Sequence, residues 1–124
     1  MKINRPKISP GLSLKKFDDI FNEEDLLLEM CEISNPEFMN EVIDRVKISD
    51  AVIKNGVFTN THFHYIDLLD VRFENCDLSN VKMPKSSIHR VEFVDCKLIG
   101  CEFPESSIGN VTFESSHLDW CTFS

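Results

Sequence analysis

The stretch from Leu69 to Ile88 reads LDVRFENCDLSNVKMPKSSI, and the stretch from His89 to Ile108 reads HRVEFVDCKLIGCEFPESSI. The two align without a gap, and the last sixteen residues, GNVTFESSHLDWCTFS, continue the same pattern. Large apolar residues and prolines recur at the same places in the first two copies. A sequence that repeats in this way is typical of a stacked repeat architecture, in which no single repeat buries its own core.

A shorter period of five runs through this repeat and extends far beyond it. Every fifth residue from Leu28 to Phe123 is large and apolar, twenty positions in a row. In a chain with 42% hydrophobic residues, chance gives such a run with a probability of roughly 10⁻⁷. A period of five fits neither an α-helix nor a simple alternating strand. The positions are Leu28, Ile33, Phe38, Ile43, Ile48, Ile53, Phe58, Phe63, Leu68, Phe73, Leu78, Met83, Ile88, Phe93, Leu98, Phe103, Ile108, Phe113, Leu118 and Phe123.

A second series of mostly small residues lies two positions before the first, as in Val71 before Phe73 and Cys76 before Leu78. A large inward residue preceded by a smaller one indicates a short extended segment followed by a tight corner. Because twenty is four fives, the sequence predicts a square coil with one pentapeptide on each side. Five such coils, spaced like neighbouring strands, make a stack roughly 24 Å tall.

The small-x-large-x-x pattern of Cys76-Asp77-Leu78-Ser79-Asn80 resembles the pentapeptide-repeat proteins, whose consensus is written A(D/N)LXX. The resemblance covers about 100 residues and implies an all-β fold, a right-handed quadrilateral β-helix with both series of residues inside. The earliest repeats depart from the consensus, because Pro36 and Glu41 occupy the small inward position and Leu26 is large there. We therefore expect an irregular first coil.

The period of five is lost before Leu28, so we expect residues 1–27 to form an N-terminal capping segment and residues 28–124 to form the β-helix. Ser13 is a candidate helix N-cap, and the apolar residues that follow it have helical spacing. Either a short helix of about two turns or an extended segment would cover the open end of the first coil. The residues with helical spacing are Leu14, Phe17, Ile20 and Phe21.

The formal net charge of −8 argues against nucleic-acid binding and against anionic membranes, because both require clustered Lys and Arg. No apolar stretch approaches the ~18 residues of a membrane span, and the basic start lacks the apolar core of a signal peptide. We therefore expect a cytoplasmic protein with reduced cysteines. Four of the five occupy the small inward position, where Cys packs as a compact hydrophobe. They are Cys76, Cys96, Cys101 and Cys121.

No constellation of residues points to catalysis, so we expect no enzyme, no cofactor and no metal. His62 and His64 flank an inward residue and point outward, but no third metal ligand lies at a fixed spacing from them. His89 and His117 are isolated. The alignment at twenty residues places Asp70 beside Arg90, and Arg72 beside Glu92. Such opposite charges on adjacent coils indicate cross-strand pairs rather than a ligand site.

The last coil has no helix, charged cap or polar tail after it. Self-association and truncation relative to longer relatives are both favoured over simple exposure, and Leu118, Trp120 and Phe123 are the candidate self-association residues. The sequence thus favours a non-enzymatic binding or scaffold module that meets a protein partner or another copy. The family resemblance implies one alternative, a DNA mimic that binds a type II topoisomerase and inhibits it or protects it from quinolones. Ion pairs that interrupt the negative charge, and the short rod, weigh against that alternative.

Overall fold

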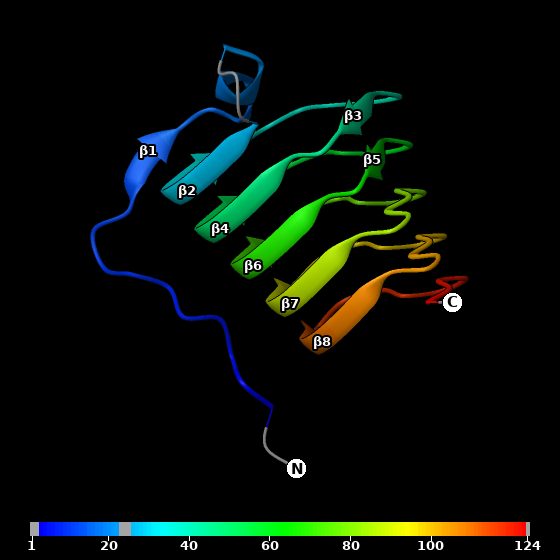
Figure 1. Ribbon diagram of the computed structural model, residues 1–124. Helices are drawn as coiled ribbons and strands as arrows, with labels where there is room; N and C mark the ends of the chain where they lie inside the picture. Colours follow the sequence, from blue (N-terminus) through cyan, green and yellow to red (C-terminus); the bar gives the residue numbers. More distant parts are fainter. Residues whose placement is uncertain (1–2, 23–25, 124) are drawn as a thin grey trace.

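The computed structural model describes residues 3–22 and 26–123, and within them the chain winds into a β-solenoid. Five coils stack along one axis, and Figure 1 shows the repeated strands one below the other. This confirms the all-β β-helix of about five coils that the sequence predicts. The Glu23, Glu24 and Asp25 part of the predicted capping segment lies outside the described residues, as do Met1 and Lys2.

The main sheet has the strand order β1-β2-β4-β6-β7-β8, and a second sheet pairs β3 with β5. All pairs are parallel, and from β2 onward partners lie twenty residues apart, as in Ile48 opposite Leu68 and Phe73 opposite Phe93. This offset is the sequence period made visible. The strands are β1 (Ser13–Lys15), β2 (Leu27–Ser34), β3 (Val42–Asp44), β4 (Lys47–Lys54), β5 (His62–His64), β6 (Asp67–Glu74), β7 (Ser87–Val94) and β8 (Ser107–Glu114).

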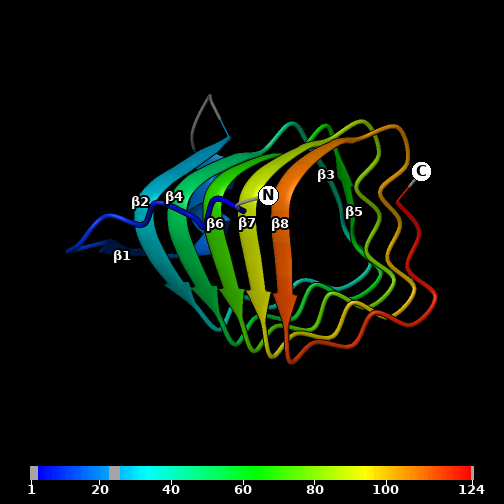
Figure 2. The ribbon, with the colours of Figure 1, turned by 90° about the horizontal axis from the view of Figure 1, so that it is seen from below.

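The corners of the coils fall two residues after each large inward residue, and Figure 2 shows the turns aligned in rows down the stack. At almost every corner the backbone has a positive φ, including Asn60 at 56°, Asp70 at 57° and Asn80 at 58°. Asn and Asp tolerate this left-handed conformation better than other residues with a side chain. The corners therefore explain why these residue types recur between the apolar positions.

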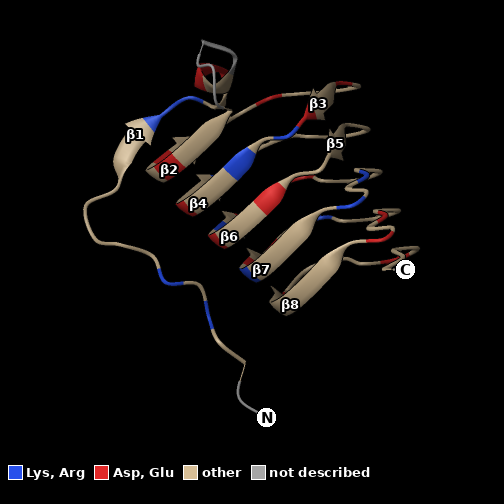
Figure 3. Ribbon diagram, viewed as in Figure 1, with Lys and Arg blue, Asp and Glu red and all other residues tan. Residues whose placement is uncertain are grey.

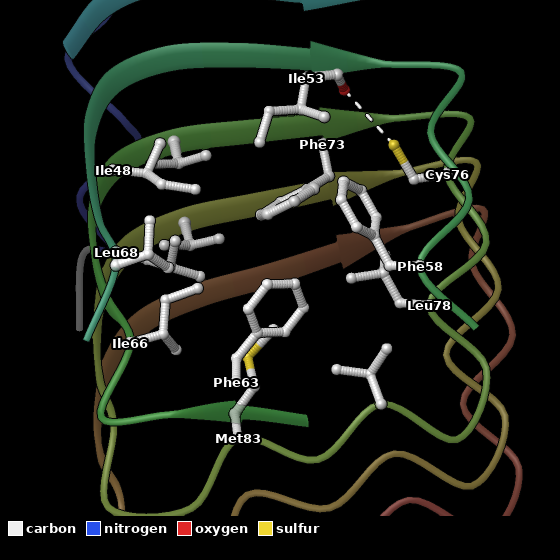
Figure 4. Packing of buried hydrophobic residues seen from close by; sticks show 14 of the residues in the cluster. Ile48, Ile53, Phe58, Phe63, Ile66, Leu68, Phe73, Cys76, Leu78 and Met83 are labelled. Atoms are coloured by element: carbon white, nitrogen blue, oxygen red, sulfur yellow. Dashed lines mark hydrogen bonds between the residues drawn. The ribbon is translucent and has the colours of Figure 1, made fainter. Parts of the chain in front are cut away.

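The interior is filled by ladders of equivalent side chains, as Figure 4 shows for Ile48 and Leu68 on one wall and for Phe58 and Leu78 on another. These side chains are at most 1% exposed. The aromatic ladder of Phe73, Phe93 and Phe113 stacks with ring centroids 5.0 and 5.1 Å apart. Such stacking adds to the free energy gained from burying the rings.

The first coil is more regular than expected, since β2 and β3 both pair with the coil below. Pro36 is buried in the small inward position. Glu41 is the true departure: its side chain is exposed, because a carboxylate without a partner is costly to bury.

The segment before the first coil combines a strand and a short 3-10 helix, η1 (Phe17–Asn22). Both alternatives that the sequence left open are present in part: Ser13–Lys15 is extended and pairs with β2, whereas the helical turns begin at Phe17, and Leu14 is 79% exposed. Pairing β1 with β2 provides hydrogen-bond partners for the backbone groups of an otherwise open edge. Phe17 and Ile20 are buried, as the apolar spacing predicts, and the side chain of Phe21 lies outside the described residues.

Candidate binding surfaces

Among the described residues, the interior of the solenoid is filled by packed apolar side chains. The void between η1 and the core measures about 10 Å³ and is lined by apolar side chains, among them Phe17, Phe58 and Met83. That is roughly the space of one water molecule, and a ligand pocket needs hundreds of cubic ångströms. Binding by the described part of the chain therefore uses the outer surface.

The last described coil is the least covered part of the core. Leu118 is partly buried beneath the preceding coil, and Phe123 is 47% exposed although its ring stacks on Phe103 at 5.1 Å. Trp120 differs from both, because it occupies a corner, has a φ of 65° and is 86% exposed. The three residues that sequence reasoning singled out thus lie on one coil, but only Trp120 points away from the interior by virtue of its position.

The four histidines lie on the outer faces and do not form one cluster. His62 and His64 flank the buried Phe63 on β5, with ring centroids 6.1 Å apart. The His89 ring lies 3.2 Å from Ser107 Oγ, and His117 is exposed. Within residues 3–22 and 26–123, no group of three His, Cys, Asp or Glu residues could hold a metal ion.

The cysteines face inward and all five are free. Burial raises the pKa of Cys31 and Cys101, and the pKa of Cys76 is raised chiefly by its hydrogen bond with Cys96, together with burial. Figure 4 shows Cys76 Sγ donating to the carbonyl oxygen of Ile53, at 3.5 Å. Protonated, hydrogen-bonded thiols of this kind are packing groups, because the thiolate is the reactive form.

Ion pairs connect charged side chains of adjacent coils, as the alignment predicts. Arg90 binds Asp70, and this hydrogen bond is the main reason why the pKa of Asp70 lies below its usual range. Arg72 lies 3.9 Å from Glu92. Because each pair places a basic side chain next to an acidic one on the neighbouring coil, the pairs interrupt the negative charge of the surface. The further pairs are Lys54 with Glu32 and Lys82 with Glu102.

Comparison with known proteins agrees with this geometry. A family model described as a pentapeptide repeat region matches residues 66–124. A pentapeptide repeat protein, Rfr23 from the cyanobacterium Cyanothece 51142, superposes with a TM-score of 0.63 over 79% of this chain and 87% of its own, at 12% identity. Residues 66–124 are a pentapeptide-repeat region, and the chain has the pentapeptide-repeat fold.

Two further solved structures are less similar to this chain. Two structures of QnrB1, a plasmid-mediated fluoroquinolone resistance protein, are 20% and 19% identical to it. They cover 73% and 75% of this chain and 69% and 70% of their own, each with a TM-score of 0.36, which is too low to support an argument about function. No curated protein matches the sequence. Pentapeptide-repeat proteins are generally non-enzymatic structural or binding folds.

Sequence reasoning missed one surface of this chain, the N-terminal arm, residues 3–12. Figure 1 shows it leaving β1 and passing along the stack toward β8. The amides of Lys7 and Ser9 donate to Asp70 Oδ1 at 3.0 Å and to Asp50 Oδ1 at 2.7 Å. The apolar residues of the arm do not recur at a fixed spacing, so the hydrophobic pattern does not predict where the arm lies. Its basic residues Arg5 and Lys7, which contact Glu92 and Asp70, were the only indication in the sequence.

Proposed function

We propose that this protein is a non-enzymatic scaffold that binds proteins through its outer surface, and that its last coil associates with a second copy of the chain. The exposed Trp120 is the observation that carries the second part. Leu118 and Phe123 border it on the same coil and supply additional apolar surface. Tryptophan is enriched among the residues that dominate protein interfaces.

A tryptophan at position 120 lowers the stability of the isolated fold, so its presence there needs an explanation. The equivalent corners of the preceding coils hold Asn40, Asn60, Asn80 and Gly100, all residue types that accept a positive φ. A bulky side chain in this conformation costs roughly 1–2 kcal/mol, and one left in water gains nothing from burial. Folding alone therefore favours Asn at position 120, and contact with a partner accounts for the indole.

The single tryptophan makes the proposal directly measurable. We expect sedimentation to show association that grows with protein concentration, together with a blue shift of tryptophan emission as the indole leaves water. Trp120→Asn restores the residue type of the other corners and is expected to abolish association. Tyr65→Asn is the matched control, because it also replaces an aromatic residue by Asn at an exposed corner. This variant should still associate. A protein that stays monomeric at high concentration, or a Trp120→Asn variant that associates normally, would contradict the proposal.

We further propose that residues 1–27 form the capping segment, in which β1 and η1 cover the first coil and the arm continues along the stack. Phe17 is 2% exposed, and its ring centroid lies 4.9 Å from that of Phe38 and 5.3 Å from that of Phe58. These contacts place an aromatic ring of η1 over the first two coils. Phe17→Ala is expected to lower the unfolding midpoint sharply, because it opens a cavity at the covered end.

The alternative, a DNA mimic that acts on a type II topoisomerase, has less support. A mimic needs a continuous negative stripe, whereas Arg90 and Lys82 each neutralise a carboxylate of the neighbouring coil. We expect no effect in a gyrase supercoiling assay, with or without a quinolone, at micromolar protein; inhibition or protection there would revive the alternative. No helix in the described part of the chain is long and apolar enough to cross a membrane. The cytoplasmic location stays a prediction.

A further inference from the structure

The N-terminal arm lies on a row of side chains, the arm-binding column, formed by Asp50, Asp70, Glu92 and Asn110. Asp50, Asp70, Arg90 and Asn110 occupy the same corner of four successive coils, twenty residues apart, and Glu92 follows that corner by two residues. Arg90 makes no hydrogen bond with the arm among those described, and its guanidinium binds Asp70 instead. Each of the four accepts a hydrogen bond from the arm. The column therefore holds a chain that runs across the coils rather than along them.

The arm is bound as an extended peptide. The Asn4 amide donates to Asn110 Oδ1 at 3.1 Å, and the amides of Lys7 and Ser9, two residues apart, face the column as in an extended chain. Five extended residues span about 16.5 Å, close to the ~14.4 Å of three coil steps from Asp50 to Asn110. Main-chain spacing thus matches the rise of the solenoid, so other extended peptides would fit the same column.

Two side chains of the arm add selectivity. Arg5 Nη2 donates to Glu92 Oε1 at 2.8 Å, and Glu92, only 5% exposed, is an unusual buried acid. The Ser9 hydroxyl donates to the second oxygen of Asp50. The column therefore recognises the side chains of an arginine and of a hydroxyl residue four positions after it. Lys7 contributes only its backbone amide, so its side chain adds no selectivity. Figure 3 shows the basic residues of the arm beside the charged corners of the strands.

The arm is held weakly enough to be displaced. None of residues 3–12 is buried, and the Arg5 side chain is 72% exposed even while it contacts Glu92. Gly11, with a φ of +69° and open space around it, connects the arm to β1. Exposed charged contacts contribute little stability and weaken with salt, and glycine readily changes conformation. The arm can therefore leave while β1 stays paired.

We propose that the arm-binding column is a recognition site for an extended basic segment of another protein, one with an arginine four residues before a hydroxyl residue, and that the chain's own arm is its resident competitor. This rests on the proposed function as a binding scaffold, but it uses the arm-binding column rather than the surface around Trp120. The arm lowers the apparent affinity for the partner's segment, because that segment binds only the fraction of molecules whose column is free.

The test uses the full chain and a fluorescently labelled peptide with the sequence of residues 3–10, followed by fluorescence anisotropy. In the double variant Arg5→Ala with Ser9→Ala the arm is weakened and the column is intact. We expect it to bind the peptide about tenfold more tightly than the unaltered chain, since an attached competitor acts at a high effective concentration. A scrambled peptide of the same composition separates spacing from charge and should bind about tenfold more weakly.

Column variants made in the arm-weakened chain locate the site. Glu92→Gln and, separately, Asp50→Asn should each weaken peptide binding several-fold, whereas Glu105→Gln, at an exposed corner outside the column, should not. Circular dichroism would show whether Glu92→Gln still folds. If it does not, Asp50→Asn tests the column at a residue that is not buried. Equal binding of the scrambled peptide, or no gain on weakening the arm, overturns the proposal. Trp120→Asn should leave peptide binding unchanged, so failure at one surface is distinguishable from failure at the other.

Discussion

Arg90 binds Asp70 on the coil before it through two hydrogen bonds: its Nε donates to Oδ1 at 2.7 Å and its Nη2 donates to Oδ2 at 2.9 Å. The same carboxylate also accepts the Lys7 amide. Asp70 therefore connects two adjacent coils and the arm.

Asp70→Asn is expected to lower stability at pH 7 by about 1 kcal/mol, because the charge-assisted bonds are weakened. The pKa of Asp70 is lowered in the folded chain, so its contribution is complete above the ordinary Asp value near 3.9 and is lost as pH falls through the lower folded value. Thermal unfolding should thus show a gap between the two proteins at pH 7 that narrows as the pH falls below the ordinary Asp value. A gap that persists unchanged in acid would contradict this account.

Gly100→Ala is expected to destabilise the protein by about 1–2 kcal/mol. Gly100 has a φ of +74°, and a Cβ at this position would collide with Oδ1 of Asn80 on the previous coil. Glu105→Asn tests the opposite direction at a corner with a φ of 54°, where Asn should raise stability by a few tenths of a kcal/mol. Denaturant unfolding measures both. If Gly100→Ala proves neutral, the corner does not require glycine.

Phe93→Ala is expected to cost about 3–5 kcal/mol, because the ring is 1% exposed and stacks between two others. Phe113→Ala, in the same ladder one coil later, is the matched control. It should cost less, since Phe113 is only partly buried. Urea unfolding of the two variants compares them, and equal losses would show that position in the stack does not determine burial energy.

Cysteine reactivity should separate the thiols by depth. Cys121 is half-buried, whereas Cys76 and Cys101 are buried with raised pKa values and are therefore protonated at neutral pH. In the native protein we expect a water-soluble disulfide reagent to modify Cys121 first, and Cys121→Ser to remove the fast phase. Rapid modification of Cys76 before unfolding would mean that the coils open locally.

The period of five predicted the square coil because a large side chain must point inward from each face, and Ile48 over Leu68 shows that register directly. The β-helix itself was implied by the family resemblance. For Leu14 the sequence left both a helix and an extended segment open, because apolar spacing cannot tell a helix from an edge strand whose backbone pairing outweighs the exposure of one side chain. The arm was missed because its contacts, such as Arg5 with Glu92, link residues 87 apart and leave no period. Trp120 was singled out for its place near the last coil, whereas the positive φ of its corner needed the structure.

The aromatic ring of Phe17 over the first coils gives the solenoid two unlike ends. Head-to-tail stacking would require the last coil of one molecule to pair with a bare first coil of the next, and η1 together with β1 occupies that place. If the last coil associates as proposed, we expect a tail-to-tail contact about a two-fold axis, and such an interface is closed at two molecules. Such a closed contact would keep a stack of parallel strands in register, otherwise a template for fibrils, from growing beyond two molecules.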